Sequence, residues 1–121
     1  MSTVVVIDED GPMRALICEW LEGARYAVDP VGGSTAVEGR SEVGLVIVDI
    51  PNLRFHGPGT VRGVRERYPH AAIIGMSTQL GRSLPGNSVE ASAMGVGRLI
   101  AKPLTRDELL AAVVDSIGVA A

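Results

Sequence analysis

Lysine, cysteine and aromatic residues are all scarce in this chain of 121 residues. Lys102 is the only lysine, Cys18 is the only cysteine, and aromatic residues make up 3% of the sequence. A single cysteine excludes an internal disulfide. Because 46% of the residues are nevertheless hydrophobic, aliphatic side chains must build the core, and the length suits one compact domain spanning residues 1–121.

Basic residues are not in excess either, since the formal net charge is -3. A protein that binds nucleic acid needs clustered Lys and Arg and an overall basic balance, so we expect no direct nucleic-acid partner. The sequence also lacks a signal peptide and any apolar run long enough to cross a bilayer. We therefore expect a cytoplasmic protein that does not bind a membrane.

An uninterrupted apolar run at residues 44–50 ends in a carboxylate, Asp49. Such a run is typical of a strand buried on both faces in the middle of a parallel sheet. In open α/β sheets, ligands bind outside the carboxyl ends of the strands. Asp49 is therefore a candidate for chemistry.

Strands and helices are expected to alternate along the rest of the chain. Further strands are predicted at 3–7, 25–29, 71–76 and 98–101. Helices are predicted from Pro12 to Ala24, weakly around 34–40, from 88 to 94, and after a capping box that opens at Thr105. One more helix, which carries Val61 and Val64 on one face, is expected to follow a loop at 51–59 and to stop at Pro69.

This alternation predicts an α/β fold, a doubly wound parallel sheet of five strands with helices on both faces. All strands then run the same way, so polar residues at their carboxyl ends converge on one edge. These residues are Asp8, Glu9 and Asp10 after the first strand, Asp49, Ser77 and Thr78, and Lys102.

The convergent groups favour phosphoryl chemistry. Carboxylates at close range repel by about 4 kcal/mol per pair at intermediate dielectric, so they take up protons or hold a cation. Mg²⁺ prefers such oxygen ligands. An ionised Asp49 could then attack phosphorus, while Lys102 and a hydroxyl bind phosphoryl oxygens. We expect Lys102 to pair with Asp49 in the resting state.

With these motifs in order, the whole chain resembles a receiver domain of a bacterial two-component response regulator. Asp8 and Glu9 match the acidic pair of that family, Asp49 its phospho-acceptor, Ser77 its Ser or Thr, and Lys102-Pro103 its Lys-Pro pair. The resemblance implies a flavodoxin-like strand order of 2-1-3-4-5. It also implies that a histidine kinase or phosphotransfer protein supplies the phosphoryl group, and that the domain catalyses only its own phosphorylation and dephosphorylation.

The resemblance further implies a set of Mg²⁺ ligands. Glu9, Asp49 and the backbone carbonyl of Pro51 would ligate the ion, and Asp8 would hold its waters. The Lys102–Pro103 peptide bond would be cis. Whether Ser77 or Thr78 supplies the hydroxyl stays open at this point.

Two departures from the family pattern concern how a signal would be transmitted. Leu99 stands where the family usually has an aromatic switch residue, so a rotating ring is missing. Residues 81–87 enlarge the loop that follows Ser77 and Thr78. Both departures leave the acceptor Asp49 intact.

Two other functions remain possible. Asp8-x-Asp10 after an apolar strand also resembles the nucleophile motif of haloacid-dehalogenase-like phosphohydrolases, with Asp8 as the nucleophile, although Asp49 would then have no role. Alternatively, the chain is a degenerate receiver that binds a partner or dimerises without phosphorylation, as Leu99 and the altered loop suggest.

The last predicted helix carries more apolar surface than a core requires. Four residues suffice to face the core, namely Leu109, Ala112, Val113 and Ile117. Apolar area on adjoining faces is added by Leu110, Ala111 and Val114. Surface of this kind marks an interface. We therefore expect a homodimer or partner contact through the fourth and fifth predicted helices, at 88–94 and after Thr105.

Overall fold

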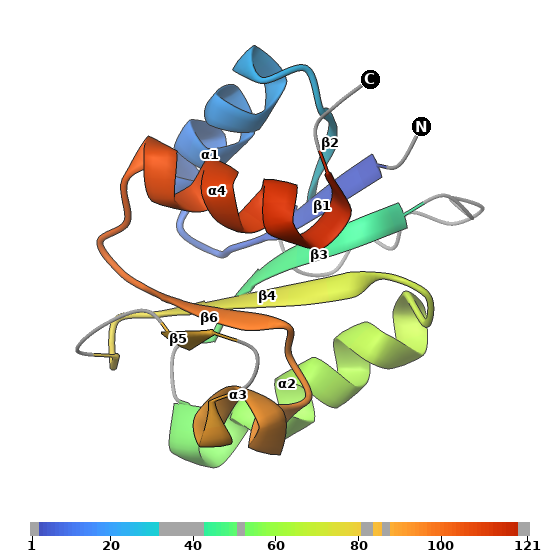
Figure 1. Cartoon of the computed structure of the whole chain (residues 1–121), viewed down its shortest axis with the longest axis vertical. Helices are drawn as coiled ribbons and strands as arrows, with labels where there is room; N and C mark the ends of the chain where they lie inside the picture. Colours follow the sequence, from blue (N-terminus) through green and yellow to red (C-terminus); the bar gives the residue numbers. More distant parts are fainter. Residues whose placement is uncertain (1–2, 32–42, 51–52, 81–83, 86–87, 119–121) are drawn as a thin grey trace.

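The computed structural model of the chain describes residues 3–31, 43–50, 53–80, 84–85 and 88–118. Within these ranges, strands and helices alternate along most of the chain (Figure 1). The elements are β1 (Thr3–Ile7), α1 (Gly11–Gly23), β2 (Ala27–Val31), β3 (Val43–Asp49), α2 (Leu53–Arg67), β4 (Ala72–Ser77), β5 (Leu84–Pro85), α3 (Val89–Met94), β6 (Arg98–Ala101) and α4 (Arg106–Ile117).

The strands form one sheet in the order β2-β1-β3-β4-β6-β5. The first five strands of this order are parallel and confirm the expected doubly wound arrangement. The sixth, β5, was not expected. It consists of two residues from the enlarged loop and pairs antiparallel with β6, Leu84 opposite Leu99. Each edge strand of the sheet contains a proline, Pro30 in β2 and Pro85 in β5.

Helices cover both faces of the sheet, as predicted. In Figure 1, α1 and α4 lie on one side of it, and α2 and α3 lie on the other. Two buried clusters correspond to these sides: Val4 and Val6 of β1 pack with residues of α1 and α4, whereas Val5 packs with residues of α2 and β4. Because neighbouring residues of a strand point to opposite faces, a strand buried on both faces must be apolar throughout. This explains the uninterrupted apolar runs.

The third predicted helix begins earlier than the sequence suggested. The expected loop at 51–59 was wrong for most of its length, because α2 already starts at Leu53 and contains Pro58. Proline and glycine have low helix propensity, but tertiary packing overrides that preference. Val61, Val64 and Tyr68 of this segment are buried against the sheet. Residues 51 and 52, including Pro51, lie outside the described residues, as does the predicted helix at 34–40.

The second strand begins two residues later than predicted, because the preceding residues terminate α1. Arg25 adopts a left-handed conformation, with φ 72°. Its amide donates to the carbonyl of Glu22, and the amide of Tyr26 donates to that of Leu21. This pair of hydrogen bonds caps the carboxyl end of a helix. Arg25 and Tyr26 are therefore used for the helix end, and β2 starts at Ala27.

The predicted amino-terminal cap at Thr105 is present, and a second cap is found at Ser88. The Thr105 hydroxyl accepts a hydrogen bond of 3.1 Å from the amide of Glu108 and opens α4, as its capping sequence indicated. Ser88 does the same for α3 through the amide of Ala91. None of the described helices combines the length and the apolar content needed to cross a membrane.

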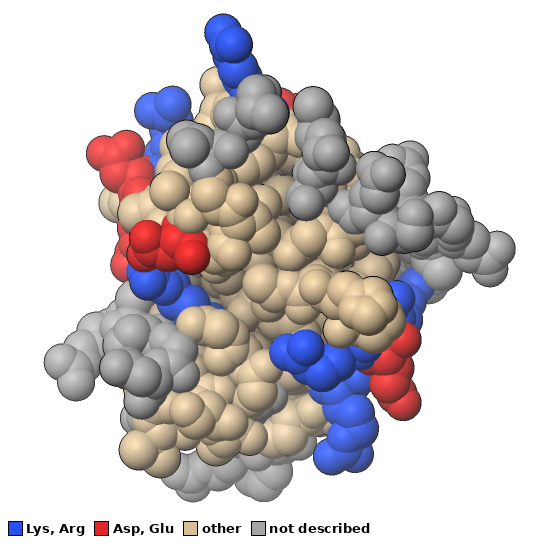
Figure 2. Space-filling view, turned by 45° about the vertical axis from the view of Figure 1, so that its right-hand side comes forward, with Lys and Arg blue, Asp and Glu red and all other residues tan. Residues whose placement is uncertain are grey.

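Basic side chains gather on the part of the surface formed by α2. Arg62, Arg65 and Arg67 of this helix are exposed, and Figure 2 shows a basic cluster in the lower half of its view, beside acidic atoms. Arg65 also donates a 2.8 Å hydrogen bond to the carbonyl of Gly95, just past the end of α3. Its charge there complements the partial negative charge of a helix carboxyl end.

Candidate functional site

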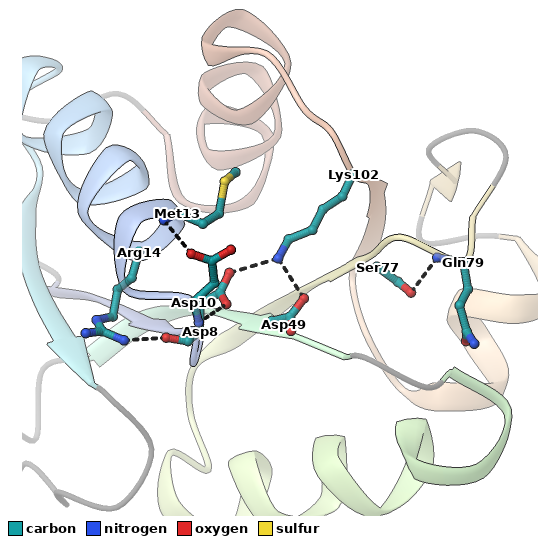
Figure 3. A network of polar contacts seen from close by, with 8 residues as sticks. All are labelled: Asp8, Asp10, Met13, Arg14, Asp49, Ser77, Gln79 and Lys102. Carbon is teal, nitrogen blue, oxygen red and sulfur yellow. Dashed lines mark hydrogen bonds and ion pairs between the residues drawn. The ribbon is translucent and has the colours of Figure 1, made fainter.

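Four predicted site residues lie at the carboxyl ends of parallel strands. Asp8 follows β1, Asp49 ends β3, Ser77 ends β4 and Lys102 follows β6. Because β1, β3, β4 and β6 are neighbours in that order, these residues gather at one edge of the sheet (Figure 3). The sequence predicted this convergence from strand polarity alone.

The ammonium of Lys102 bridges two carboxylates. Its Nζ lies 2.8 Å from Oδ1 of Asp49 and 2.9 Å from Oδ2 of Asp8. The pairing with Asp49 was expected, and the pairing with Asp8 was not. Burial disfavours the charged ammonium, but the hydrogen bonds with Asp49 and Asp8 outweigh burial, so the pKa of Lys102 is raised. Lys102, which follows β6, is therefore a cation held by carboxylates at the ends of β1 and β3.

The two carboxylates differ in their access to solvent. The side chain of Asp8 is 1% exposed, whereas that of Asp49 is 18% exposed. Both oxygens of Asp8 are engaged, since Oδ1 accepts a 3.0 Å hydrogen bond from the amide of Asp10 and Oδ2 faces Lys102. Asp49 is therefore the carboxylate that a reactant can approach. Asp8 is a buried carboxylate whose hydrogen bonds help to hold Lys102 in place.

The other two acids after β1 have separate positions. Asp10 is the N-cap of α1, where its Oδ1 accepts a 3.1 Å hydrogen bond from the amide of Met13. Such a cap stabilises a helix by about 1 kcal/mol. Glu9, in contrast, is exposed. Asp10 thus has a structural role at the start of α1.

The structure distinguishes the two candidate hydroxyl residues at the end of β4. Ser77 is fully buried, whereas Thr78 is exposed. The main-chain carbonyl of Ser77 accepts a 2.9 Å hydrogen bond from the amide of Lys102, which fixes the two strand ends against each other. The Ser77 hydroxyl accepts a 3.0 Å hydrogen bond from the amide of Gln79 and points toward that residue in Figure 3.

Oxygen ligands for a metal ion are present in part. The carboxylates of Asp8 and Asp49 are hard donors of the kind that Mg²⁺ prefers, and Glu9 lies beside Asp8 in sequence. Within the described ranges, however, no three His, Cys, Asp or Glu side chains come together closely enough to hold a metal ion. The predicted carbonyl ligand, Pro51, lies outside these ranges, so the full predicted set is not described.

Two further features concern β6 and the residues after it. The Lys102–Pro103 peptide bond is cis. Leu99, at the position where the resemblance implies an aromatic residue, is fully buried. A Cβ added at Gly75 of β4 would lie 2.9 Å from Cδ2 of Leu99 and 3.0 Å from Cδ1 of Ile50. Leu99 is therefore packed tightly against the strand that carries Ser77.

Arg14 contacts the site, although no sequence pattern indicated it. This residue lies in the first turns of α1, and its guanidinium donates a 2.5 Å hydrogen bond to the main-chain carbonyl of Asp8. Arg14 is not one of the apolar positions that predict this helix, so the helical periodicity assigned it no role. No spacing rule links a helical arginine to a carbonyl six positions earlier, because the contact depends on the shape of the intervening turn.

Comparisons with known proteins identify the fold. Neither a protein-family model nor a curated protein matches the sequence. A response regulator from Thermotoga maritima is 23% identical, with a TM-score of 0.75 over 97% of this chain and 98% of that one. The response regulator receiver domain protein from Clostridium thermocellum is also 23% identical, with a TM-score of 0.75 over 97% and 94% of the two chains. A chemotaxis response regulator of Vibrio cholerae is 22% identical, with a TM-score of 0.74 over 97% and 99%. The chain therefore has the fold of response-regulator receiver domains.

Proposed function

We propose that this chain is a receiver domain that accepts a phosphoryl group on Asp49 from a histidine kinase or a phosphotransfer protein. The observation that carries this proposal is the bridge that Lys102 forms between Asp8 and Asp49. A lone lysine between two strand-end carboxylates matches a site that binds a phosphoryl group, and the receiver fold supports the same conclusion.

Asp49 is the nucleophile in this proposal. Its carboxylate pairs with an ammonium and is the more accessible of the two. An oxygen of Asp49 therefore attacks phosphorus, and the donor's leaving group departs with its electron pair. Lys102 then pairs with a phosphoryl oxygen and offsets its charge. Ser77 ends β4, the strand next to β3, and its hydroxyl is the proposed donor to another phosphoryl oxygen.

Mg²⁺ is the proposed cofactor, and the donor chemistry of the described residues fits it. Glu9 and Asp49 would ligate the ion together with the carbonyl of Pro51, and Asp8 would hold its waters. Bound there, Mg²⁺ supplies positive charge that offsets the repulsion between Asp49 and an incoming phosphoryl group. Asp8 keeps its orientation through the Asp10 amide.

Treatment with a small phosphodonor and Mg²⁺, followed by intact-mass measurement and peptide mapping, tests the proposal. The parent should gain one phosphoryl group on Asp49, and a chelator should prevent it. Asp49→Asn should gain none. Asp10→Asn is the matched control, because Asn also serves as an N-cap, and it should be labelled like the parent. Labelling of Asp49→Asn at the parent's rate would refute the assignment.

A second candidate is a receiver that acts without phosphorylation. It is favoured by Leu99, which stands in place of an aromatic residue and is fully buried. In that case the parent and Asp49→Asn would both stay unlabelled and would bind a partner equally well. The phosphohydrolase alternative is disfavoured, because both oxygens of Asp8 are engaged and its side chain is buried.

Association through the last helix, α4, also remains a proposal. The neighbouring helix that would share the interface differs, however, from the one that the sequence suggested. On α4, Asp115 reaches β6 by a 2.8 Å ion pair with Arg98. Helical periodicity then places Leu110 and Val114 on the opposite flank, toward α1 and away from α3. Val114 is 40% exposed and Leu16 of α1 is 38% exposed. We propose that a homodimer, if it forms, uses α1 and α4 and not α3 and α4.

A further inference from the structure

We infer that Arg14 is a positioning residue that holds the turn between β1 and α1 in the shape that a cation site requires. This inference rests on the proposed function of Asp49, Asp8 and Glu9 as a Mg²⁺-dependent acceptor site. Arg14 itself touches none of the carboxylates through a described contact. Its side chain acts on the main chain beneath them (Figure 3).

The contact is placed where it determines the direction of the turn. The Asp8 carbonyl belongs to the peptide group that joins Asp8 to Glu9, so a donor that fixes this carbonyl also fixes the plane of that peptide. The plane in turn sets the direction in which Glu9 leaves the strand end. The hydrogen bond from Arg14 to the carbonyl of Asp8 is 2.5 Å long, and a charged donor makes such a bond stronger than a neutral one.

The neighbouring hydrogen bonds fix the rest of the turn but leave this peptide group to Arg14. The amide of Asp10 donates to Oδ1 of Asp8, and the amide of Met13 donates to Oδ1 of Asp10. The amide of Arg14 donates to the carbonyl of Asp10 and begins the helical ladder. Among the described residues, Arg14 is thus the helical side chain that hydrogen-bonds back to Asp8, the residue before Glu9.

Glu9 depends on this link more than its neighbours do. Asp8 is held from its side chain by Lys102 and by the Asp10 amide, and Asp10 is held as the N-cap. Glu9 is exposed, so its position derives from the main chain. Loss of the Arg14 contact should therefore displace Glu9 first and leave the fold largely intact.

Positioning and simple electrostatics predict opposite results for metal binding. Asp8, Glu9, Asp10 and Asp49 carry four negative charges near Lys102 and Arg14, so removal of the Arg14 charge makes the site more negative. Electrostatics alone would then tighten the binding of a divalent cation. Loss of a positioning contact instead weakens it, commonly by about tenfold or more when an outer partner of a ligand is removed. The sign of the change therefore separates the two.

The experiment is calorimetric titration of Mg²⁺ into the parent, Arg14→Met and Arg14→Lys without phosphodonor. Arg14→Met should bind Mg²⁺ about tenfold more weakly than the parent. Arg14→Lys keeps the positive charge and a hydrogen-bond donor, so its affinity for Mg²⁺ should lie between those of the parent and Arg14→Met. Arg62→Met is the control, because it removes an exposed cation on the opposite side of the sheet, and it should bind like the parent. Equal or tighter binding by Arg14→Met would overturn the inference.

Amide hydrogen exchange provides a readout that does not require the metal. In Arg14→Met, the Glu9 and Asp10 amides should exchange about tenfold faster than in the parent and in Arg62→Met, while amides of β3 and β4 stay protected. If the parent bound no Mg²⁺, the metal part of the proposed function would fail, and exchange alone would decide the role of Arg14. Unchanged exchange at both amides would refute it.

Discussion

The hydroxyl of Tyr26 donates a 2.7 Å hydrogen bond to the main-chain carbonyl of Gly118. It joins the residue before β2 to the residue after α4, 92 positions later. Tyr26 is buried in the cluster that α1 and α4 share. This hydrogen bond thus ties the start of β2 to the end of α4 on one side of the sheet.

Tyr26→Phe should lower the free energy of unfolding by about 1 kcal/mol, because it removes this hydrogen bond and leaves the ring packing in place. Chemical denaturation of the parent and the variant at neutral pH measures the difference. Tyr68→Phe is a useful comparison, since the Tyr68 hydroxyl is buried without a hydrogen-bond partner among the described residues. That change should be neutral or stabilising. A loss equal to that of Tyr26→Phe would contradict the assigned hydrogen bonds.

The contribution of Tyr26 should depend on pH in the alkaline range. Burial raises the pKa of Tyr26 above its usual value of 10.0. A raised pKa means that the folded state holds the proton more tightly than the unfolded state, so the stabilisation is complete below pH 10.0 and is lost as pH rises through the folded-state pKa. The stability difference between the parent and Tyr26→Phe should therefore shrink above about pH 10. A difference that stays constant there would disprove this linkage.

Arg25→Gly should stabilise the protein by about 1 kcal/mol. Arg25 has a left-handed conformation, with φ 72°, which costs an L-residue about 1–2 kcal/mol and costs glycine little. Thermal or denaturant unfolding measures the gain. The neighbouring change Ala24→Gly is the control, because Ala24 has φ -94° and should lose stability on substitution. Equal effects of the two glycines would show that backbone strain at Arg25 is not the cause.

Gly75→Ala should destabilise the protein by about 1–3 kcal/mol, the usual cost of overpacking a core. The new methyl group would meet Leu99 at 2.9 Å and Ile50 at 3.0 Å. Leu99→Val shortens one of these neighbours, so the double variant should recover part of the loss. A double-mutant cycle from urea midpoints measures this coupling. Strict additivity would mean that Gly75 and Leu99 do not share the packing described above.

Lys102→Met should destabilise the protein by about 3 kcal/mol at neutral pH without divalent cations. The change leaves the buried Asp8 carboxylate and the partly buried Asp49 carboxylate without their shared cation. Mg²⁺ should restore part of the loss in melting temperature. Arg98→Met breaks the exposed pair with Asp115 and should cost less than about 1 kcal/mol. Similar losses for both variants would argue against a special role of Lys102.

Leu16→Glu and Val114→Glu should prevent self-association if the parent forms dimers. These side chains are exposed apolar groups on neighbouring helices, and a charge at either position would be desolvated in an interface. Sedimentation with and without phosphodonor measures the oligomeric state. Val89→Glu is the control, because Val89 is also exposed but belongs to α3. Dimer loss in Val89→Glu alone would instead favour α3 as part of the interface.

Strand positions and the convergence of Asp8, Asp49, Ser77 and Lys102 could be predicted because they follow from one-dimensional patterns. Buried parallel strands require unbroken apolar runs, and parallel strands share one carboxyl edge. The start of α2 could not be predicted, since local propensity at Pro58 and its flanking glycines opposes a helix that tertiary packing sustains. The second partner of Lys102 and the contact of Arg14 depend on side-chain reach across a turn, which no sequence period encodes.

The prolines in β2 and β5 have a consequence for the behaviour of the protein at high concentration. An edge strand exposes unpaired amide and carbonyl groups, and these can pair with a strand of another molecule. Proline lacks the amide hydrogen that such pairing needs. Pro30 lies within β2, and Pro85 ends the two-residue β5 that covers β6. Both margins of the sheet therefore resist the strand-to-strand growth that leads to insoluble aggregates.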